Sequence, residues 1–295
     1  MNKGESSLVV RVHEDPSLFR EAVNFTTAET AFASRLIEKD YFCTVLLAYL
    51  ASATDDRFVF KGGTCLAKVH ANFYRLSEDL DFVVPMPVDA PRAERSKQAK
   101  PLKEAIEKLP KRLPEFRLVE PLKGANNSTQ YIAVVGYSSL IRQQEETIKI
   151  EVGLREPLLT PVVKSPARTI ILDPVSGKSL VPQVSVRCIS KTEAMAEKFR
   201  AALSRREAAI RDFFDIDYAV RMLGLQPRNA AFIKLVRQKI DVSGNDPVDI
   251  SGDRLKVLGL QLEPRLKPVL RAKDFAEFDL DRAFKIVADV AAMVQ

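Results

Sequence analysis

Cysteine and histidine are scarce in this sequence, which contains three cysteines and two histidines among 295 residues. Cys43, Cys65 and Cys188 are scattered along the chain and form no C-x-x-C pair. Neither His13 nor His70 stands at a metal-ligand spacing from them. The spacing therefore predicts no zinc site. Cysteines of this kind are expected to be small buried hydrophobic residues, and His70 to be packed or exposed.

Long hydrophobic runs are also missing. The longest uncharged apolar run covers residues 41–54, which is too short to cross a bilayer. The first fifteen residues, MNKGESSLVVRVHED, carry charges throughout and do not resemble a secretion signal. We expect a cytoplasmic protein with no membrane partner. The composition, 46% hydrophobic and 28% charged, is ordinary for a globular protein with a substantial core.

The charge is mildly basic and unevenly distributed. The formal net charge is +6, with a pI of about 9.1. Arg92–Lys123 carries ten Lys and Arg residues against five Asp and Glu, and the chain from Arg187 onward carries twenty against sixteen. A phosphate backbone would be attracted to such regions, although a solvated helix face explains each of them nearly as well.

The stretch between these regions, Phe58–Val84, is the most informative part of the sequence. It reads FVFKGGTCLAKVHANFYRLSEDLDFVV, which predicts a strand, a glycine turn, a helix ending near Tyr74 and a second strand. The residues Lys61, Gly62 and Gly63 interrupt the first strand, and Thr64 is expected to cap the helix.

The second strand of this stretch begins with two carboxylates. Asp79 and Asp81 are two residues apart, so on a strand both side chains face one side of the sheet. Two adjacent carboxylates repel one another unless a cation lies between them, and a hard dication such as Mg²⁺ fits that role. The turn of Gly62, Gly63 and Thr64 lets the backbone approach an anion such as a triphosphate. Together these features predict phosphoryl or nucleotidyl transfer.

A third carboxylate is available from a later strand. The segment TIKIEVGL alternates cleanly, so its Ile and Val residues face the core while Lys149 and Glu151 face the other side. If this strand lies beside the D-x-D strand, Glu151 joins Asp79 and Asp81 as a metal ligand. A surface glutamate on a half-exposed strand is the alternative.

The C-terminal region is predicted to be helical. Ser190 and Glu193 form a capping box before the helix SKTEAMAEKFRAALSRR, where Lys198 lies next to the buried face. In the next helix Arg211, Asp212 and Asp215 fall within one turn, and the two aspartates are three residues apart. Arg211 is expected to offset part of their charge.

The remaining helices and strands are predicted from hydrophobic periodicity and from the Gly, Pro and polar residues that interrupt it. Thr26 or Thr27 is a plausible helix N-cap with Glu29 at its third position. Further elements are expected as helices at 37–53, 93–109, 229–240, 263–270 and 279–294, and as strands at 116–120, 130–137, 147–154, 169–172 and 184–189. The fold class is α+β, with a mixed sheet preceded by N-terminal helices and followed by a C-terminal helical domain. The domain boundary is expected between residues 186 and 187.

The motifs FKGGTCLAKVHANFYRLSEDLDFVV, IEKDYFCTVLLAYL and EAMAEKFRAALSRREAAIRDFFDIDYAV resemble those of the AbiEii family of nucleotidyltransferase-like toxins, which includes the MenT toxins. The resemblance spans roughly residues 37–220 and implies a polymerase-β-type nucleotidyltransferase fold. It supports catalytic roles for Asp79, Asp81, Lys198 and Asp215, with Asp212 as runner-up for Asp215.

The resemblance also implies a reaction and partners. The enzyme is expected to transfer nucleotides from a nucleoside triphosphate, with Mg²⁺, to an RNA 3′ end such as that of tRNA, thereby blocking translation. An antitoxin protein is the implied partner. Lys61, Gly62, Gly63, Thr64, Arg75 and Arg211 are the expected substrate contacts. A protein or small-molecule acceptor, or a non-catalytic nucleotide- or RNA-binding module, remains an alternative.

Overall fold

The computed structural model describes residues 11–295, which divide into two compact units. The first unit runs to Leu158 and also includes Val162–Ile189, and the second contains Leu159–Pro161 and Ser190–Gln295. The chain thus changes unit between Ile189 and Ser190, three residues after the boundary predicted from sequence. Most of the segment that predicted no secretion signal lies outside the described residues.

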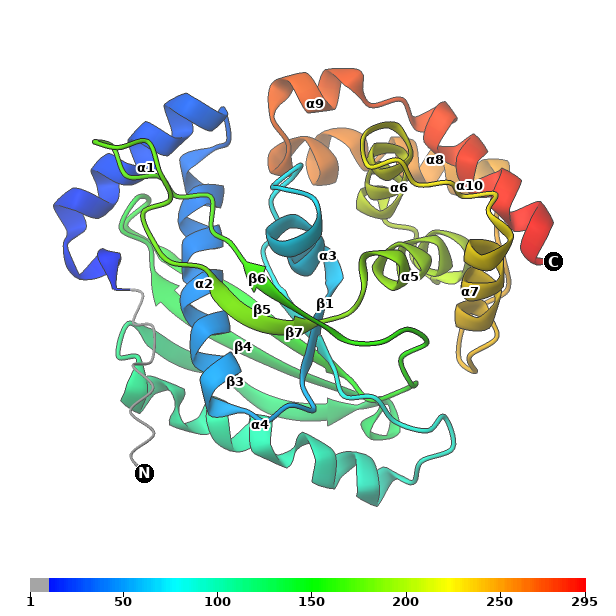
Figure 1. Ribbon diagram of the computed structural model, residues 1–295, viewed down its shortest axis with the longest axis horizontal. Coiled ribbons are helices and arrows are strands. Elements are labelled where there is room, and N and C mark those ends of the chain that lie inside the picture. Colours follow the sequence, from blue (N-terminus) through cyan, green and yellow to red (C-terminus); the bar gives the residue numbers. More distant parts are fainter. Residues whose placement is uncertain (1–10) are drawn as a thin grey trace. The chain divides into compact units, whose positions relative to one another are not determined.

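A mixed seven-stranded sheet forms the centre of the first unit (Figure 1). The strand order is β3–β4–β5–β2–β1–β7–β6, with β2–β5 and β1–β7 parallel and the other neighbours antiparallel. The strands are β1 Val59–Lys61, β2 Leu80–Val83, β3 Phe116–Ala125, β4 Gln130–Ser138, β5 Glu145–Gly153, β6 Val163–Ala167 and β7 Val184–Cys188. The predicted mixed sheet is confirmed.

Helix α2 crosses this sheet (Figure 1) and buries one of its faces. Phe42 of α2 stacks on Tyr137 of β4, with ring centroids 4.1 Å apart, and meets Phe116 of β3 edge-on. Ile148 and Ile150 of β5 are fully buried. The core therefore lies on this face, and the alternate residues of β5 are left for the other. The helical elements of the unit are η1 Val12–Glu14, α1 Pro16–Thr30, α2 Ser34–Ala53, α3 Gly62–Cys65, η2 Leu66–His70, α4 Arg92–Arg112 and η3 Asn126–Ser128.

The predicted cap at Thr26 or Thr27 is wrong. Helix α1 begins after Asp15, whose carboxylate accepts from the backbone N–H groups of Ser17 and Leu18. Thr26 lies near the end of that helix, where its hydroxyl donates to the carbonyl of Ala22. Asp15 followed by proline is the stronger start signal, because the carboxylate accepts and proline needs no N–H partner.

The predicted strand at 169–172 is also wrong, since this segment makes only an isolated bridge between Leu172 and Ser179. The strand in this region is β6, which pairs with β7. Pro166 argued against a strand at this position in the sequence, because proline has no N–H group to donate to a neighbouring strand. β6 is an edge strand, the position that tolerates proline.

The second unit is helical, as predicted. Its elements are α5 Lys191–Ser204, α6 Ile210–Met222, α7 Ala230–Ile240, α8 Gly252–Gly259, η4 Leu262–Leu266, η5 Lys267–Val269, α9 Ala272–Glu277 and α10 Leu280–Val294. Ser190 caps α5 by accepting from the N–H of Glu193, as expected. The Glu193 carboxylate binds the N–H groups of Leu159 and Thr160 and the ammonium of Lys239.

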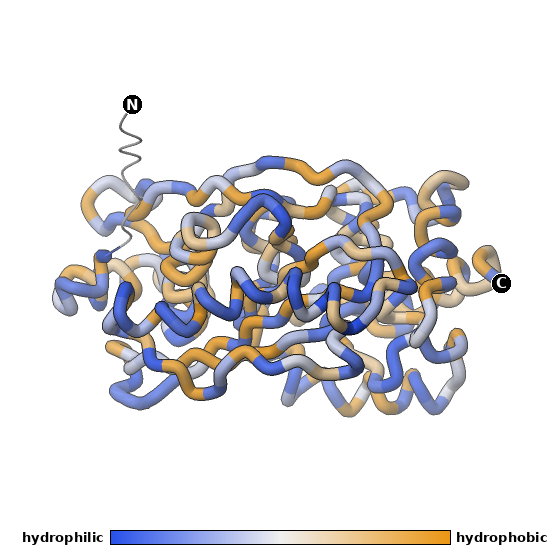
Figure 2. The backbone as a smooth tube through the Cα atoms, turned by 90° about the horizontal axis from the view of Figure 1, so that it is seen from below, coloured by the Kyte–Doolittle hydropathy of each residue, from blue (hydrophilic) through white to orange (hydrophobic). Residues whose placement is uncertain are grey.

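Within residues 11–295, no helix combines the length and the apolar character needed to cross a membrane. Figure 2 shows why: along the backbone, hydrophobic segments are repeatedly broken by hydrophilic ones.

Candidate active site

The turn after β1 brings the backbone against a carboxylate. Gly62 adopts a left-handed conformation with φ of +77°, and a Cβ atom placed on it would lie 2.1 Å from Oδ2 of Asp81. Only glycine can combine that conformation with that contact. The helical segment starts at once, as α3 and the π-helical turn η2, and ends at His70 rather than near Tyr74.

Asp81 lies in the centre of the sheet, between two strands. On one side it is paired with Lys61 of β1, and on the other with Glu151 of β5. Residues that are paired across a ladder project to the same face of a sheet. The parallel pairing of β2 with β5 therefore places Glu151 next to Asp81, which was the condition for its proposed role as a third acid.

Asp79 immediately precedes β2 and is held from two directions. Its Oδ1 accepts from the backbone N–H of Lys149 at 3.4 Å. Its carbonyl oxygen accepts from the hydroxyl of Thr64. Thr64 lies inside α3 and caps no helix, so the predicted cap is wrong. The hydroxyl instead ties the glycine turn to the start of the carboxylate strand.

The electrostatics of the site show crowded negative charge. Burial and the neighbouring carboxylate of Glu151 raise the pKa of Asp81 to about 6, and Asp79 adds to the increase. Lys61 and Lys149 act in the opposite direction without cancelling it. The surroundings of Asp81 therefore disfavour its charged form.

Lys149 and Gln130 are site residues that the sequence did not identify as such. The ammonium of Lys149 donates to Glu151 at 3.1 Å, and the amide of Gln130 donates to the other Glu151 oxygen at 2.7 Å. Burial lowers the pKa of Lys149, but Glu151, Asp79 and Asp81 raise it overall. Lys149 could have been identified from the sequence, because the alternating pattern places it on the same face as Glu151. The contact of Gln130 with Glu151 depends on the pairing of β4 with β5, which the sequence pattern does not show.

Arg75 lies behind the turn. It is buried, donates to the carbonyl of Leu76 at 3.2 Å, and lies over the ring of Tyr74. A Cβ on Gly63 would come within 2.7 Å of the Arg75 guanidinium and 3.1 Å of the Ser77 hydroxyl. Arg75 therefore packs directly against the second glycine of the turn.

These residues suit a hard divalent cation. Asp79, Asp81 and Glu151 offer carboxylate oxygens, the ligand type that Mg²⁺ prefers. Burial and the carboxylate of Glu151 raise the pKa of Asp81, so a cation bound here would stabilise its charged form. Gly62, which has no side chain, brings its backbone directly against the Asp81 carboxylate. By donor chemistry and charge, the residues fit magnesium.

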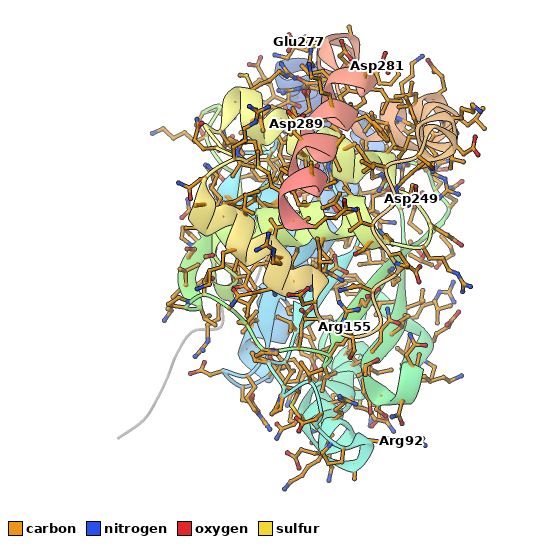
Figure 3. All side chains as sticks on the ribbon, turned by 90° about the vertical axis from the view of Figure 1, so that its right-hand side faces the viewer. Arg92, Arg155, Asp249, Glu277, Asp281 and Asp289 are labelled. Carbon is orange, nitrogen blue, oxygen red and sulfur yellow. The ribbon has the colours of Figure 1, made fainter. Side chains whose placement is uncertain are left out.

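The second unit contains a separate charged cluster. The Lys198 ammonium lies 2.7 Å from Asp212 and 2.8 Å from Asp215, and both aspartates are buried. This burial sets them apart from the exposed Glu277 and Asp281 (Figure 3). Lys198 offsets the charge of both aspartates, and the Arg205 guanidinium lies 3.6 Å from Asp212. The Arg211 guanidinium donates to the carbonyl of Arg265 at 3.1 Å.

The sequence spacing predicted no zinc site, but three of the cysteine and histidine residues are close together in the fold. The fold brings Cys65, His70 and Cys188 together, with ligand atoms all within 4.8 Å of one another. No local motif could indicate this cluster, because Cys188 lies more than a hundred residues from the other two.

The fold resembles that of a known toxin. MenT4, a nucleotidyltransferase toxin from Mycobacterium tuberculosis, superposes with a TM-score of 0.56 at 20% identity, covering 95% of this chain and 92% of its own. A nucleotidyltransferase-related chain and JHP933, both from Helicobacter pylori, share 19% and 18% identity over 88% of this chain. They cover 90% and 88% of their own chains, and their TM-scores of 0.43 and 0.44 are too low to support an argument.

No curated protein matches the chain in sequence. The family comparison is positive: residues 44–290 match the family described as nucleotidyl transferase AbiEii toxin, type IV toxin–antitoxin system. The match covers most of the chain, including the glycine turn, the three carboxylates and the charged cluster of the second unit. The chain therefore belongs to the AbiEii family of nucleotidyltransferase toxins and is a nucleotidyltransferase.

Proposed function

We propose that this enzyme transfers a nucleotidyl group from a nucleoside triphosphate to the 3′ end of an RNA, and that tRNA is the RNA. Blocking the 3′ end of tRNA would stop its aminoacylation and hence translation in the cytoplasm. The observation that carries the proposal is the pairing of Asp81 with Glu151 in the sheet beside the Gly62 turn. Family membership implies a nucleotide substrate and an antitoxin partner.

Asp79, Asp81 and Glu151 are the proposed magnesium ligands. When bound, the ion supplies Lewis-acid stabilisation of the triphosphate and helps to activate the attacking hydroxyl. Lys149 and Gln130 hold the Glu151 carboxylate from both oxygens, so its orientation is fixed before substrate arrives. Such preorganisation avoids a reorganisation cost during the reaction.

The glycine turn is proposed to hold the β- and γ-phosphates. Gly62, Gly63 and Thr64 present backbone N–H groups at the start of α3, where no side chain caps them. The Thr64 hydroxyl already donates to Asp79, so we assign phosphate binding to the N–H groups. Lys61 lies beside Asp81 and adds positive charge, while Arg75 keeps the turn in shape from behind.

Lys198 is proposed to add positive charge to the triphosphate, with Asp212 and Asp215 orienting its ammonium. The two ion pairs hold that ammonium in one position, which is the role expected of a group that orients a catalytic cation. Arg211 is a weaker candidate for substrate contact, since its guanidinium is engaged by the carbonyl of Arg265. These roles remain predictions.

An RNA acceptor is supported by charge. The exposed side of α4 carries Lys97, Lys100, Lys103, Lys108 and Lys111, within the most basic part of the first unit. Phosphate backbones are attracted to surfaces of this kind.

The test uses total RNA and protein from a bacterial lysate, incubated with the purified enzyme, Mg²⁺ and each radiolabelled nucleoside triphosphate in turn. We expect label that RNase removes and protease does not, and sequencing should find added nucleotides at tRNA 3′ ends. Label that survives RNase but not protease would establish a protein acceptor. Label found only in small molecules would likewise contradict the RNA proposal.

A further inference from the structure

Three side chains outside the carboxylate site form a compact cluster within the first unit. Cys65, His70 and Cys188 each offer one potential ligand atom, and these atoms lie within 4.8 Å of one another. Both cysteines are fully buried and His70 is half-buried. Neither the carboxylate site nor the proposed nucleotidyl transfer uses any of the three.

The backbone explains how distant residues meet here. Cys65 ends α3 and His70 ends η2, a π-helical turn closed by the N–H of Ala71 donating to the carbonyl of Leu66 at 2.8 Å. π-helical turns are rare in proteins, but those that occur are often found at functional sites. Cys188 ends β7, where it pairs with Phe60 of β1, the strand that leads into α3. The end of β7 therefore lies beside α3 and η2, which carry Cys65 and His70.

The orientation of His70 is fixed by a backbone group. Its Nε2 lies 2.9 Å from the carbonyl oxygen of Ile189, the residue after Cys188. Because a carbonyl oxygen only accepts, the neutral ring carries its proton on Nε2 and keeps the lone pair on Nδ1. Metal-binding histidines almost always donate their other ring nitrogen to a carbonyl or carboxylate in this way.

The cysteines of the cluster differ from the third cysteine. Burial raises the pKa of Cys43 to about 12, as expected for a thiol in apolar surroundings. Cys43 therefore serves as the control for the two cysteines of the cluster.

We propose that Cys65, His70 and Cys188 bind a zinc ion through two thiolates and Nδ1, with water completing the tetrahedron. Thiolate and imidazole ligands select zinc over the hard ion expected at the carboxylates. Two thiolates balance its charge, so no counter-ion has to be buried. The ion joins the end of β7 to the segment that follows Gly62 and Gly63, and thereby holds the glycine turn against Asp81.

The ligand set is tested with the full-length chain and Co²⁺ in place of zinc. Wild-type protein should show thiolate-to-cobalt charge-transfer absorption that saturates at one ion per chain, together with the intense visible bands of tetrahedral cobalt. Ions held by carboxylates alone give no thiolate band, so this signature distinguishes the cluster from the magnesium site and does not depend on activity. Wild-type protein that shows no such bands would overturn the proposal, whether or not the variants fold.

Variants separate the three cysteines. Cys188→Ser and His70→Asn should lose stoichiometric zinc, measured by elemental analysis after gel filtration, whereas Cys43→Ser should retain it. Removing zinc with a chelator should lower the Tm of wild type and Cys43→Ser but not that of Cys188→Ser. Equal zinc loss in Cys43→Ser would overturn the assignment. So would recovery of Cys65 and Cys188 as a disulfide from freshly lysed cells.

Discussion

At the scale of single residues, Gly62 and Asp81 constrain one another. The backbone of Gly62 comes so close to the Asp81 carboxylate that a methyl group would lie 2.1 Å from its oxygen. A side chain at position 62 would therefore displace Asp81. The glycine motif and the D-x-D motif are 16 residues apart in sequence, counted from Gly63 to Asp79, but they are in contact in the fold.

Gly62→Ala is expected to destabilise the chain and to remove most of the activity. The alanine meets Asp81 and is also strained at φ of +77°. Gly177→Ala is the matched control, because Gly177 has φ of +66° and nothing within 4 Å of an added Cβ. Backbone strain alone should cost about 1 kcal/mol, and the clash should add about 1 to 3 kcal/mol. Equal unfolding free energies for the two variants, measured with urea, would show that the contact with Asp81 is absent.

Asp81→Asn is expected to stabilise the metal-free enzyme while abolishing transfer. Asparagine removes the cost of burying a charged carboxylate and its repulsion by Glu151, together about 1 to 3 kcal/mol at neutral pH. Activity should fall about 1000-fold, since metal stabilisation of the transition state is worth several kcal/mol. Thermal unfolding in EDTA measures the first effect. Asp56→Asn, at an exposed position, should change neither quantity.

At the scale of elements, β2 and β5 decide whether there is a site. Alternation in TIKIEVGL predicted which face Glu151 occupies, but it could not supply the strand order. Only the parallel register places Glu151 beside Asp81. Lys149 was predictable to the same extent, whereas Gln130 was not, because its contact with Glu151 depends on a third strand.

The helix α5 depends on a buried ion pair at its N-terminal end. The carboxylate of Glu193 and the ammonium of Lys239 lie 2.7 Å apart, both fully buried. Burial raises the pKa of Glu193, but Lys239 and the N–H groups of Leu159 and Thr160 lower it overall. The unfolded chain then binds a proton before the folded one does as the pH falls.

Glu193 should therefore contribute stability above its unfolded pKa, near 4.5, and lose that contribution as the pH falls through its lower folded value. Glu193→Gln should cost about 3 kcal/mol at pH 7 and flatten the loss of Tm on acidification relative to wild type. Glu263→Gln removes an exposed pair with Lys267 and should cost less than about 0.5 kcal/mol. Parallel pH profiles for wild type and Glu193→Gln would refute this assignment.

At the scale of the whole molecule, a net charge of +6 is compatible with RNA binding, but it does not show which surface would bind the RNA. Two basic regions were recognisable in the sequence, one containing α4 and one containing the second unit. Removing the same number of positive charges from each region separates the effect of their location on RNA binding from the effect of total charge.

Changing Lys103, Lys108 and Lys111 to glutamine should weaken RNA binding and lower the slope of log affinity against log salt by about three, if each contacts a phosphate. Changing Lys256, Lys267 and Lys273, which are equally exposed in the second unit, removes the same charge and should do less. Filter binding over a range of salt concentrations measures both. Identical slopes for the two triple variants would show that only total charge matters.

Sequence reasoning worked best where chemistry is local and failed where it is assembled from a distance. The D-x-D strand, the glycine turn and the helical second unit follow from short-range patterns. The Cys65, His70 and Cys188 cluster does not, because it depends on β7 returning to pair with β1. The edge strand β6 was missed for a related reason, since its proline is acceptable only at a sheet edge.

The most direct test is calorimetric binding of a nucleoside triphosphate with and without Mg²⁺, in wild type, Asp81→Asn and Glu151→Gln. If the three carboxylates hold the ion against a triphosphate on the glycine turn, wild type should bind only with Mg²⁺, and both variants should lose that magnesium dependence. Magnesium-dependent binding of undiminished affinity in either variant would contradict the assignment of that carboxylate.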